Sequence, residues 1–334
     1  MKKVFYVNVA GGMGYNCAFA SWVAEYKTEH PDEIEVYVTS PYADLFEACS
    51  AIDGVYRPNE IRDFIFDANS KGATLVMHRL YDMDGFIKKQ LNYSEAWSDL
   101  LGLPRLEKTP VAAFDLITTK YPATVNQRDG IVKAIKDKGF EDFVIMQFTG
   151  GQSPLVQVPA GIRKDENGND VQFPDWSKVQ YNYDNEPLKR HYPIEKAQKF
   201  AEAFMKEHPK TAIIAYQLPN EPVIRGANIL QTTVPYLVYN LLAKDDMCRG
   251  IVSIDSSLPH ITAGLTKTVV IWAHSTDKSF GYDYNKNILQ DCRRDDILYF
   301  TALGASGARV DYIKPQTLLK EVDEYLYDTA KGNE

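Results

Sequence analysis

The stretch that decides the fold reads Gly250-Ile-Val-Ser-Ile-Asp-Ser-Ser-Leu-Pro-His-Ile-Thr-Ala-Gly-Leu265 and continues as Thr268-Val-Val-Ile-Trp-Ala-His274. An apolar, β-branched run ends at Asp255, two serines and a short helical segment follow it, and a second apolar run then begins. This order predicts a strand, a tight turn, a helix start and another strand, which is the layout of a nucleotide-binding α/β unit.

Ser256 and Ser257 stand where helix N-caps usually stand. Backbone N–H groups and the positive end of the helix dipole would therefore face the carboxyl end of the strand. An anion such as a diphosphate binds well in that position. An ordinary capped turn between a strand and a helix would show the same pattern, so this segment alone leaves both interpretations open.

The composition is that of a globular protein, because 45% of the 334 residues are hydrophobic and 25% are charged. This length allows two domains of ordinary size. The net charge of −8 argues against a broad surface for membranes or nucleic acid, although it permits a local basic patch. We see no signal peptide, no membrane-spanning run and no metal-type cysteine spacing, and we expect a cytoplasmic protein with reduced thiols.

Strands and helices alternate twice along the chain. In the first half we expect strands at 3–9, 34–39 and 73–78, a glycine turn at 10–14, and helices at 17–29 and 42–50. In the second half we expect strands at 142–148 and 211–216 and helices at 194–207 and 234–243, followed by the stretch quoted above. Each block predicts a parallel sheet covered by helices, so the fold class is α/β, with two Rossmann-like domains facing across a cleft.

We expect a first domain over residues 1–140, a second over residues 141–314, and a C-terminal helix over 315–334 that packs back on the first domain. An inserted segment near 151–187 contains an Asn-Gly turn between short extended runs, which predicts a β-hairpin. Aromatic residues accompany this hairpin segment, namely Phe173, Trp176, Tyr181 and Tyr183.

Several motifs together carry a resemblance to a known family. The run from Asp255 to His260 matches a family signature. In this signature an aspartate is followed by a small hydroxyl residue, then usually by a glycine, and a histidine stands five positions after the aspartate. Here Ser256 is the hydroxyl residue, and Ser257 takes the place of the glycine. Further matches are Arg190-His-Tyr-Pro193 before a helix, Glu221 beyond the next strand, the Gly11-Gly-Met-Gly14 loop, and Ser40-Pro-Tyr42. Over nearly its whole length the chain resembles the heptosyltransferase-type glycosyltransferases of family nine, which have the GT-B fold.

This resemblance implies an inverting glycosyltransferase with an acceptor-binding first domain, a nucleotide-sugar-binding second domain and no obligatory cofactor. Amides around Ser256–Leu258 and the Arg190 guanidinium would stabilise the departing nucleoside diphosphate, and Glu221 would accept hydrogen bonds from ribose hydroxyls. A packed, hydrogen-bonded His260 and a solvated Lys189–Arg190 pair are the alternatives. The donor-binding candidates are Gly12, Gly14, Thr149, Arg190, Glu221, Asp255, Ser256, Ser257 and His260.

The general base departs from the family pattern. Many members have an acidic residue directly after the second loop glycine, where this chain has Tyr15 and then Asn16. A tyrosine with an ordinary pKa near 10 is a poor base at pH 7. We therefore expect Asp82 or Asp84, which follow a strand, to take the acceptor proton, with a Tyr15 of lowered pKa as the fallback. Helix capping and turn chemistry would also explain both aspartates.

Asp82-x-Asp84 also resembles the metal-binding motif of the other large glycosyltransferase fold. Two Rossmann-like blocks favour GT-B instead, in which helix dipoles and basic residues neutralise the leaving group. His78, His260 and His274 have no metal-ligand spacing. We therefore expect no metal site.

Three functional hypotheses follow. The leading one is inverting transfer of a hexosyl, pentosyl or heptosyl unit from a nucleotide-diphosphate sugar to a hydroxyl acceptor of the glycan type. A second acceptor class is a hydroxymethylated base of phage DNA, because the aromatic hairpin and nearby basic residues could stack a base or hold phosphate; a solvated lid would explain the same segment. The third hypothesis is a non-catalytic nucleotide-sugar-binding protein, which the Tyr15 substitution leaves open.

Overall fold

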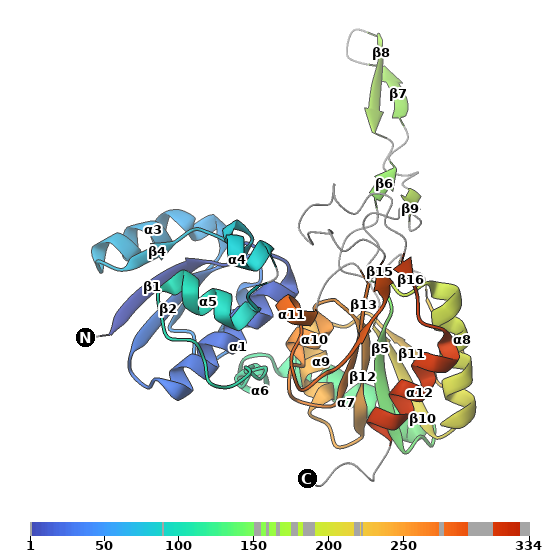
Figure 1. Ribbon diagram of the computed structural model, residues 1–334. Coiled ribbons are helices and arrows are strands. Elements are labelled where there is room, and N and C mark those ends of the chain that lie inside the picture. The colour runs from blue at the N-terminus through green and yellow to red at the C-terminus, as the bar shows by residue number, and fades with distance from the viewer. Residues whose placement is uncertain are drawn as a thin grey trace.

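The computed structural model describes residues 2–88, 90–149, 155–157, 160–164, 168–174, 180–182, 191–216, 221, 223–273, 277–292 and 310–327. Within these ranges the chain forms two α/β lobes that lie side by side, each with a parallel sheet at its centre (Figure 1). The two predicted Rossmann-like blocks are therefore both present, one in each lobe.

The first sheet has the strand order β3-β2-β1-β4, and its neighbouring strands run parallel. Its strands are β1 (Lys3–Asn8), β2 (Ile34–Thr39), β3 (Gly54–Tyr56) and β4 (Thr74–Val76). The helical segments of this part of the chain are α1 (Met13–Glu29), α2 (Ala43–Glu47), η1 (Pro58–Glu60), α3 (Ile61–Ser70), η2 (Leu80–Asp82), α4 (Asp84–Ile87), α5 (Tyr93–Leu101) and α6 (Ile117–Lys120). The sequence pattern predicts β1, β2, β4, α1 and α2, whereas β3, α3 and α5 are not among its predictions.

Helix α1 covers this sheet with an aromatic face. Phe19, Val23 and Tyr26 of this helix are fully buried. Trp97 of α5 is also fully buried, and its ring centroid lies 4.3 Å from that of Phe19. Burying one large apolar side chain stabilises a fold by roughly 1.5–3 kcal/mol, so this layer anchors α1 and α5 on the first sheet.

The second sheet is also parallel, with the strand order β11-β10-β5-β12-β13-β14. Its strands are β5 (Asp142–Gln147), β10 (Thr211–Tyr216), β11 (Ile229–Thr232), β12 (Cys248–Ile254), β13 (Thr268–Trp272) and β14 (Lys286–Leu289). The helices of this half are α7 (Pro122–Asp137), α8 (Ile194–Glu207), α9 (Tyr236–Ala243), α10 (Leu258–Ile261), α11 (Asp277–Phe280) and α12 (Pro315–Leu326).

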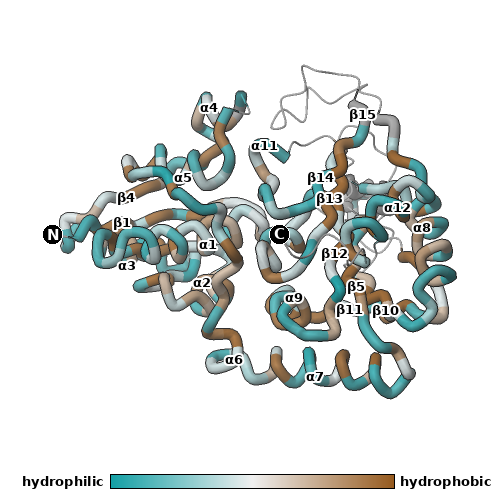
Figure 2. Tube along the Cα trace, turned by 60° about the horizontal axis from the view of Figure 1, so that its bottom comes forward, coloured by the Kyte–Doolittle hydropathy of each residue, from teal (hydrophilic) through white to brown (hydrophobic). Residues whose placement is uncertain are grey.

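The strands of this sheet are mostly hydrophobic, whereas α7 and α8 alternate between hydrophobic and hydrophilic positions (Figure 2). All residues of β5 and β10 are buried, which is typical of a parallel sheet covered on both faces. On α8, Ala197, Phe200, Ala201 and Phe204 are fully buried and form the face of this helix that packs on the sheet.

The predicted β-hairpin is present beyond the second sheet. β7 (Ala160–Lys164) pairs antiparallel with β8 (Asp170–Pro174), and the Lys164 ammonium lies 2.9 Å from the Asp170 carboxylate. The other short pairs are β6 (Leu155–Gln157) with β9 (Gln180–Asn182) and β15 (Asp291–Cys292) with β16 (Val310–Asp311). The hairpin projects from the second lobe (Figure 1). Trp176 and Tyr183, which we expected to accompany it, lie outside the described residues, as do the side chains of Phe173 and Tyr181.

The C-terminal helix corrects one expectation. α12 packs against α8 and β12 of the second lobe, not across the first lobe. Its apolar stripe joins the core that contains Phe200 and Phe204, because α12 begins a few residues after β16 at the edge of the second lobe. The buried residues of that stripe are Leu318, Leu319, Val322 and Leu326.

One hydrophobic core is continuous across the two lobes, in addition to the core around Phe200 and Phe204 in the second lobe. A single cluster of buried residues includes side chains from both sheets, and α1 contacts α10. The connecting segment is tied to the second lobe, since the Ala112 amide donates to the Ala263 carbonyl at 2.8 Å and the Tyr284 hydroxyl donates to the Pro110 carbonyl at 2.8 Å. α7 packs against α9 of the second lobe, while the division at residue 140 remains a prediction.

Among the residues that the structure describes, no helix combines the length and the apolar character that crossing a membrane requires. Cys17, Cys49 and Cys248 are free thiols. Burial raises the pKa of the Cys49 thiol to about 11, so this side chain packs as a small neutral group.

Candidate functional site

The strand orders indicate where a ligand binds. In each sheet the second and third strands along the chain add successively on one side of the first strand. The fourth strand lies on the other side of the first. A crevice opens at the carboxyl ends of the two strands that flank such a switch point, and ligands of open α/β sheets bind there. The relevant pairs are β1 with β4 in the first lobe and β5 with β12 in the second.

The glycine loop follows β1 at the switch point of the first sheet. Gly12 is the N-cap of α1, which begins four residues earlier than we expected. Asn16 explains the early start, because its side-chain amide donates to the carbonyls of Gly11 (3.1 Å) and Gly12 (2.9 Å). Its Oδ1 also accepts a hydrogen bond from the Ser40 hydroxyl at 2.6 Å. Asn16 therefore holds the loop between the ends of β1 and β2.

The donor-side turn follows β12 at the switch point of the second sheet. The Ser256 hydroxyl donates to Gln147 Oε1 at 2.5 Å, which joins the carboxyl ends of β12 and β5. Ser256 Oγ also accepts a hydrogen bond from the Leu258 amide at 3.3 Å. Ser257 occupies the N-cap position of α10 as predicted, but it has helical backbone angles and makes no side-chain capping bond. The local cap is therefore Ser256.

A second polar pair lies beside this turn. The Thr149 hydroxyl, just beyond β5, donates to the Glu221 carboxylate at 3.0 Å, and Glu221 follows β10. Asp255 is buried at the end of β12. The structure thus brings Thr149, Glu221 and the Asp255–Ser257 turn together at the carboxyl edge of one sheet, as a donor site requires. Arg190 and His274 lie outside the described residues.

His260 lies between the two lobes rather than in an open site. Its buried ring hydrogen-bonds through Nδ1 to the Tyr282 hydroxyl at 2.9 Å and packs edge-on against Tyr93 of the first lobe. Gly14 lies directly against it, since a Cβ placed on Gly14 would be 2.6 Å from His260 Cδ2. This environment fits the packed histidine that we weighed as the alternative, while a role in donor binding remains a prediction.

Tyr15 is not suited to act as a base. Its side chain is buried among Tyr81, Tyr93 and Trp97, and its hydroxyl accepts a hydrogen bond from the Leu80 amide at 3.2 Å. Burial raises the pKa of Tyr15 far above its usual value, because the phenolate would lose its hydration. The fallback hypothesis of a Tyr15 with a lowered pKa is therefore wrong.

Asp82 and Asp84 follow β4, at the switch point of the first sheet. Asp82 closes a 3-10 turn, because its carboxylate accepts a hydrogen bond from the Arg79 amide at 2.9 Å. That hydrogen bond and the nearby guanidinium lower the pKa of Asp82. Asp84 begins α4, and its exposed carboxylate pairs with Lys88 at 3.0 Å. α4 faces the second lobe, since the Phe86 ring centroid lies 5.4 Å from that of Phe280 in α11.

The sequence reasoning missed two residues of this site, Gln147 and Tyr282. Gln147 ends a strand that is otherwise apolar after its first residue, and this polar interruption was the available signal. Tyr282 gave no such signal, because tyrosines are frequent in this chain and only the tertiary structure places this one beside His260.

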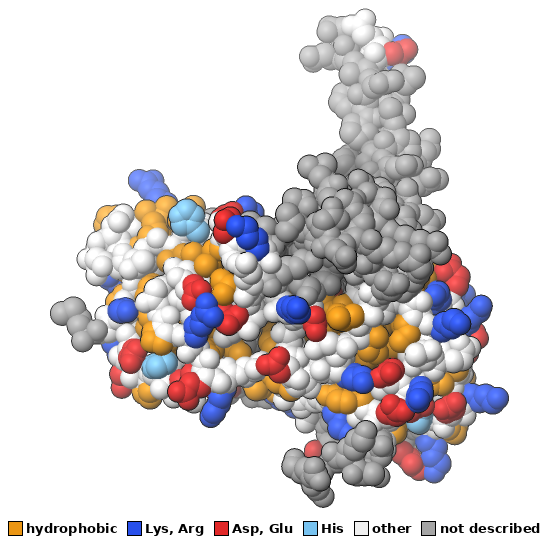
Figure 3. Space-filling model, in the orientation of Figure 1, with side chains coloured by type: hydrophobic (Ala, Val, Ile, Leu, Met, Phe, Trp, Pro, Cys, Tyr) orange, Lys and Arg blue, Asp and Glu red, His pale blue; other side chains and the backbone are white. Residues whose placement is uncertain are grey.

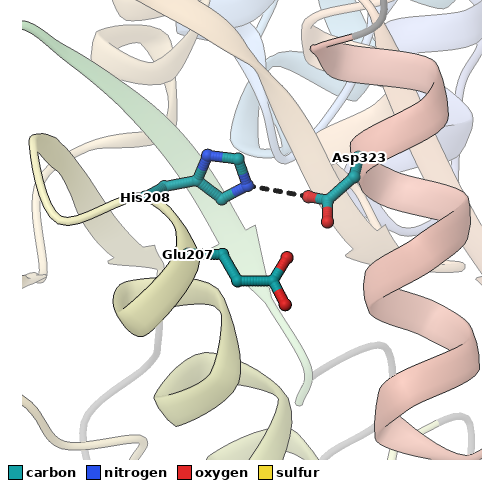
Figure 4. Close-up of side chains that lie close together, drawn as sticks. All are labelled: Glu207, His208 and Asp323. Atoms are coloured by element: carbon teal, nitrogen blue, oxygen red, sulfur yellow. Dashed lines mark hydrogen bonds and ion pairs between the residues drawn. The ribbon is translucent and has the colours of Figure 1, made fainter.

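One cluster of the described residues could offer three metal ligands. Glu207, His208 and Asp323 bring their ligand atoms within 4.8 Å of one another (Figure 4). His208 Nε2 hydrogen-bonds directly to Asp323 Oδ1 at 2.8 Å, whereas an ion about 2.0–2.2 Å from both atoms would hold them further apart. The cluster lies at the end of α8 that precedes β10, and so at the opposite edge of the sheet from the donor-side turn. We interpret it as a clamp between α8 and α12.

His208→Ala is expected to lower the free energy of unfolding by about 1–2 kcal/mol, because the Asp323 carboxylate loses its partner. The variant also loses the contact of the imidazole with Tyr327, whose ring centroid is 4.0 Å away. Urea denaturation followed by circular dichroism measures the change. Glu207→Ala is the matched control and should be nearly neutral because Glu207 is exposed. Equal losses in both variants, together with destabilisation by a chelator, would contradict the clamp and indicate a bound metal.

Two Rossmann-like lobes, joined where the glycine loop of one meets the donor-side turn of the other, define the GT-B fold. No family model and no curated protein sequence matches the chain. Over 98% of its length it is similar to the E. coli ADP-heptose lps heptosyltransferase II, with 10% identity, 98% coverage of that chain and a TM-score of 0.60. It is also similar to the glycosyl transferase family 9 structure from Veillonella parvula, with 9% identity, 98% of each chain covered and a TM-score of 0.59.

A third similar structure is the E. coli heptosyltransferase WaaC with ADP. It shares 10% identity and a TM-score of 0.50, with 96% of this chain and 99% of that chain covered. At such low identities the similarity establishes the fold and not the activity. The predicted GT-B fold class, which is the fold of the heptosyltransferase-type enzymes, is confirmed.

Proposed function

We propose that this protein is a glycosyltransferase that transfers a sugar from a nucleotide-diphosphate sugar to a hydroxyl acceptor. The observation that carries this proposal is the meeting of the two switch-point loops within a GT-B fold, where Gly14 contacts His260 and Ser257. A donor held at one loop and an acceptor held at the other would be brought together at this junction. The similar structures support the donor class, since WaaC was solved with ADP.

The diphosphate is proposed to lie beside Ser256–Leu258, with Arg190 as the cationic partner and Glu221 directed to the ribose. As the glycosidic bond to the diphosphate breaks, negative charge develops on the leaving group, and backbone N–H groups with a guanidinium stabilise that charge. The predicted first domain, residues 1–140, is proposed to hold the acceptor, and the predicted second domain, residues 141–314, is proposed to hold the donor.

The proposed chemistry is a single displacement with inversion. The acceptor oxygen forms a bond to the anomeric carbon while the bond from that carbon to the diphosphate oxygen breaks, and the acceptor proton passes to a carboxylate. Asp84 is the better candidate for this carboxylate, because Asp82 is committed to the Arg79 amide. Asp84 is exposed on the helix of the first lobe that faces the second.

Arg190→Ala is expected to weaken donor binding by about 1.5–3 kcal/mol, or roughly 10- to 150-fold, because one charge-assisted contact to the diphosphate is lost. Calorimetric titration with nucleotide-sugars measures the change. Lys189→Ala removes the neighbouring cation and serves as the matched control, with little expected effect. Unchanged affinity in Arg190→Ala would argue against this donor site.

The function itself is tested by a thermal-shift screen of nucleotide-sugars, followed by mass spectrometry of acceptor pools incubated with each stabilising donor. The pools include glycans and hydroxymethylated DNA. A mass increase of one sugar unit in any acceptor supports transfer and identifies the acceptor class. A donor that binds without transfer or hydrolysis in every pool would indicate a nucleotide-sugar-binding protein instead.

A further inference from the structure

A cavity lies between the lobes, apart from the proposed donor site. Its volume is about 370 Å³, and its walls come from α1, the first turn of α5, the loop at residues 105–110, and α11 with the turn that follows it. The described lining includes none of the donor-binding candidates. Tyr282 forms part of the wall and hydrogen-bonds to His260 behind it, so these two rings separate the cavity from the donor-side turn.

The wall formed by the loop at residues 105–110 is firmly braced. Two consecutive backbone amides of this loop donate to the Glu29 carboxylate of α1, both at 3.0 Å. The Arg105 guanidinium pairs with Glu95 at 2.9 Å and with Asp99 at 2.8 Å, which ties the loop to α5. A cavity of this size with fixed walls is within the usual range of about 300–1,000 Å³ for ligand sites.

The opposite wall is braced by aromatic contacts. The Phe280 ring of α11 packs against Tyr93 and Phe86 of the first lobe, with centroids 5.1 and 5.4 Å away. Because both lobes contribute to the lining, the cavity exists only in the arrangement in which they are in contact. A ligand that fits it would favour that arrangement.

The charges of the lining limit the chemistry of a ligand. Figure 3 shows basic and acidic side chains interspersed over the described surface of both lobes. The carboxylates of the described lining are Glu95, Glu107, Asp277 and Asp283, and its cations are Arg105, Lys108 and Lys278. The four carboxylates of the described lining therefore outnumber its three cations, and Arg105 is paired with Glu95 and with Asp99. A phosphate would be repelled by this excess of negative charge.

An apolar ligand is also disfavoured, because it would remove polar groups of the lining from water without replacing their hydrogen bonds. Hydroxyl groups can donate to carboxylates and accept from lysine and amide N–H groups, and they carry no charge. A neutral ligand with many hydroxyls therefore matches the lining. We propose that this cavity binds a neutral saccharide, at a site separate from the nucleotide-sugar site.

The test is saturation-transfer NMR of the full chain with maltose, lactose and cellobiose, and with inorganic phosphate and ADP as separate probes. We expect saturation transfer to at least one disaccharide. Ser94→Trp places an indole in the cavity from α5 and should abolish that signal, while Ser70→Trp, the same change on exposed α3, should not. Asp283→Ala should weaken saccharide binding about tenfold or more, since a hydrogen bond to a carboxylate is lost.

Absence of transfer to every disaccharide, persistence of the signal in Ser94→Trp, or displacement of the saccharide by phosphate would each overturn the proposal. The inference stands independently of the proposed transfer reaction, because ADP binding is read in the same samples and depends on different residues. If addition of a nucleotide-sugar increases the mass of the bound disaccharide by one sugar unit, the disaccharide is an acceptor. The cavity would then be part of the transfer site, and the proposed separation of the two sites would be wrong.

Discussion

Asp84→Asn is expected to lower the turnover number by about 10²–10⁴-fold with a verified acceptor, because removal of a general base has effects of this size. Donor affinity should be retained, since the proposed donor residues lie in the other lobe. The fold should also survive, because the exposed ion pair with Lys88 contributes only about 0.3–0.5 kcal/mol. Product formation followed by mass spectrometry and donor titration by calorimetry measure the two quantities.

Lys88→Gln is the matched control, because it breaks the same ion pair and leaves the carboxylate in place. It should retain turnover within a few-fold. Asp82→Asn tests the other carboxylate and should mainly loosen the turn that its hydrogen bond to the Arg79 amide closes. Full turnover in Asp84→Asn would place the base elsewhere and leave this segment with a structural role.

Gly14→Ala is expected to destabilise the protein by about 1–3 kcal/mol, the usual range for a methyl group forced into a packed site. The new Cβ would lie 2.6 Å from His260 Cδ2 and 3.4 Å from the Ser257 Cα. The imidazole cannot easily give way, because Tyr282 and Tyr93 hold it. Since the clash lies at the meeting of the two loops, donor binding and turnover should fall as well. Chemical denaturation and donor titration measure both effects.

Gly12→Ala is the control within the same loop, because no atom lies within 4 Å of a Cβ at that position. It should change stability by less than Gly14→Ala. The double variant Gly14→Ala with His260→Ala removes the ring that causes the clash, so its loss should be smaller than the sum of the two single losses. If the loss of stability in the double variant equals the sum of the two single losses, Gly14 and His260 do not interact. The explanation that Gly14→Ala acts through a clash between the two loops would then be wrong.

Local patterns predicted several elements residue by residue. β2 (Ile34–Thr39), β10 (Thr211–Tyr216) and α8 (Ile194–Glu207) have the bounds expected from the sequence. Each has a strong apolar periodicity or run that its immediate neighbours interrupt. The Asn-Gly turn likewise predicted the hairpin of β7 and β8.

One missed helix carried a readable signal. Asn92 and Glu95 form a reciprocal capping box at the start of α5, with side-chain to backbone hydrogen bonds of 2.9 and 3.0 Å. That spacing is a sequence-level mark of a helix start. β3, which the sequence pattern did not predict, has only three residues, and this is too short for a strand periodicity to show.

The sequence by itself determined the two α/β blocks and the residues that follow each central strand, because both depend on periodicity and spacing along the chain. The motifs that match the heptosyltransferase-type family separately carried the resemblance to the GT-B fold. Only the tertiary structure decided that α12 docks on α8, that Tyr15 is buried against the Leu80 amide, and that His260 packs between the lobes. Burial and partner choice depend on surfaces that segments far apart in the chain present to one another. A local pattern shows that a helix has an apolar face, but the shape and chemistry of the facing segment determine where that face is buried.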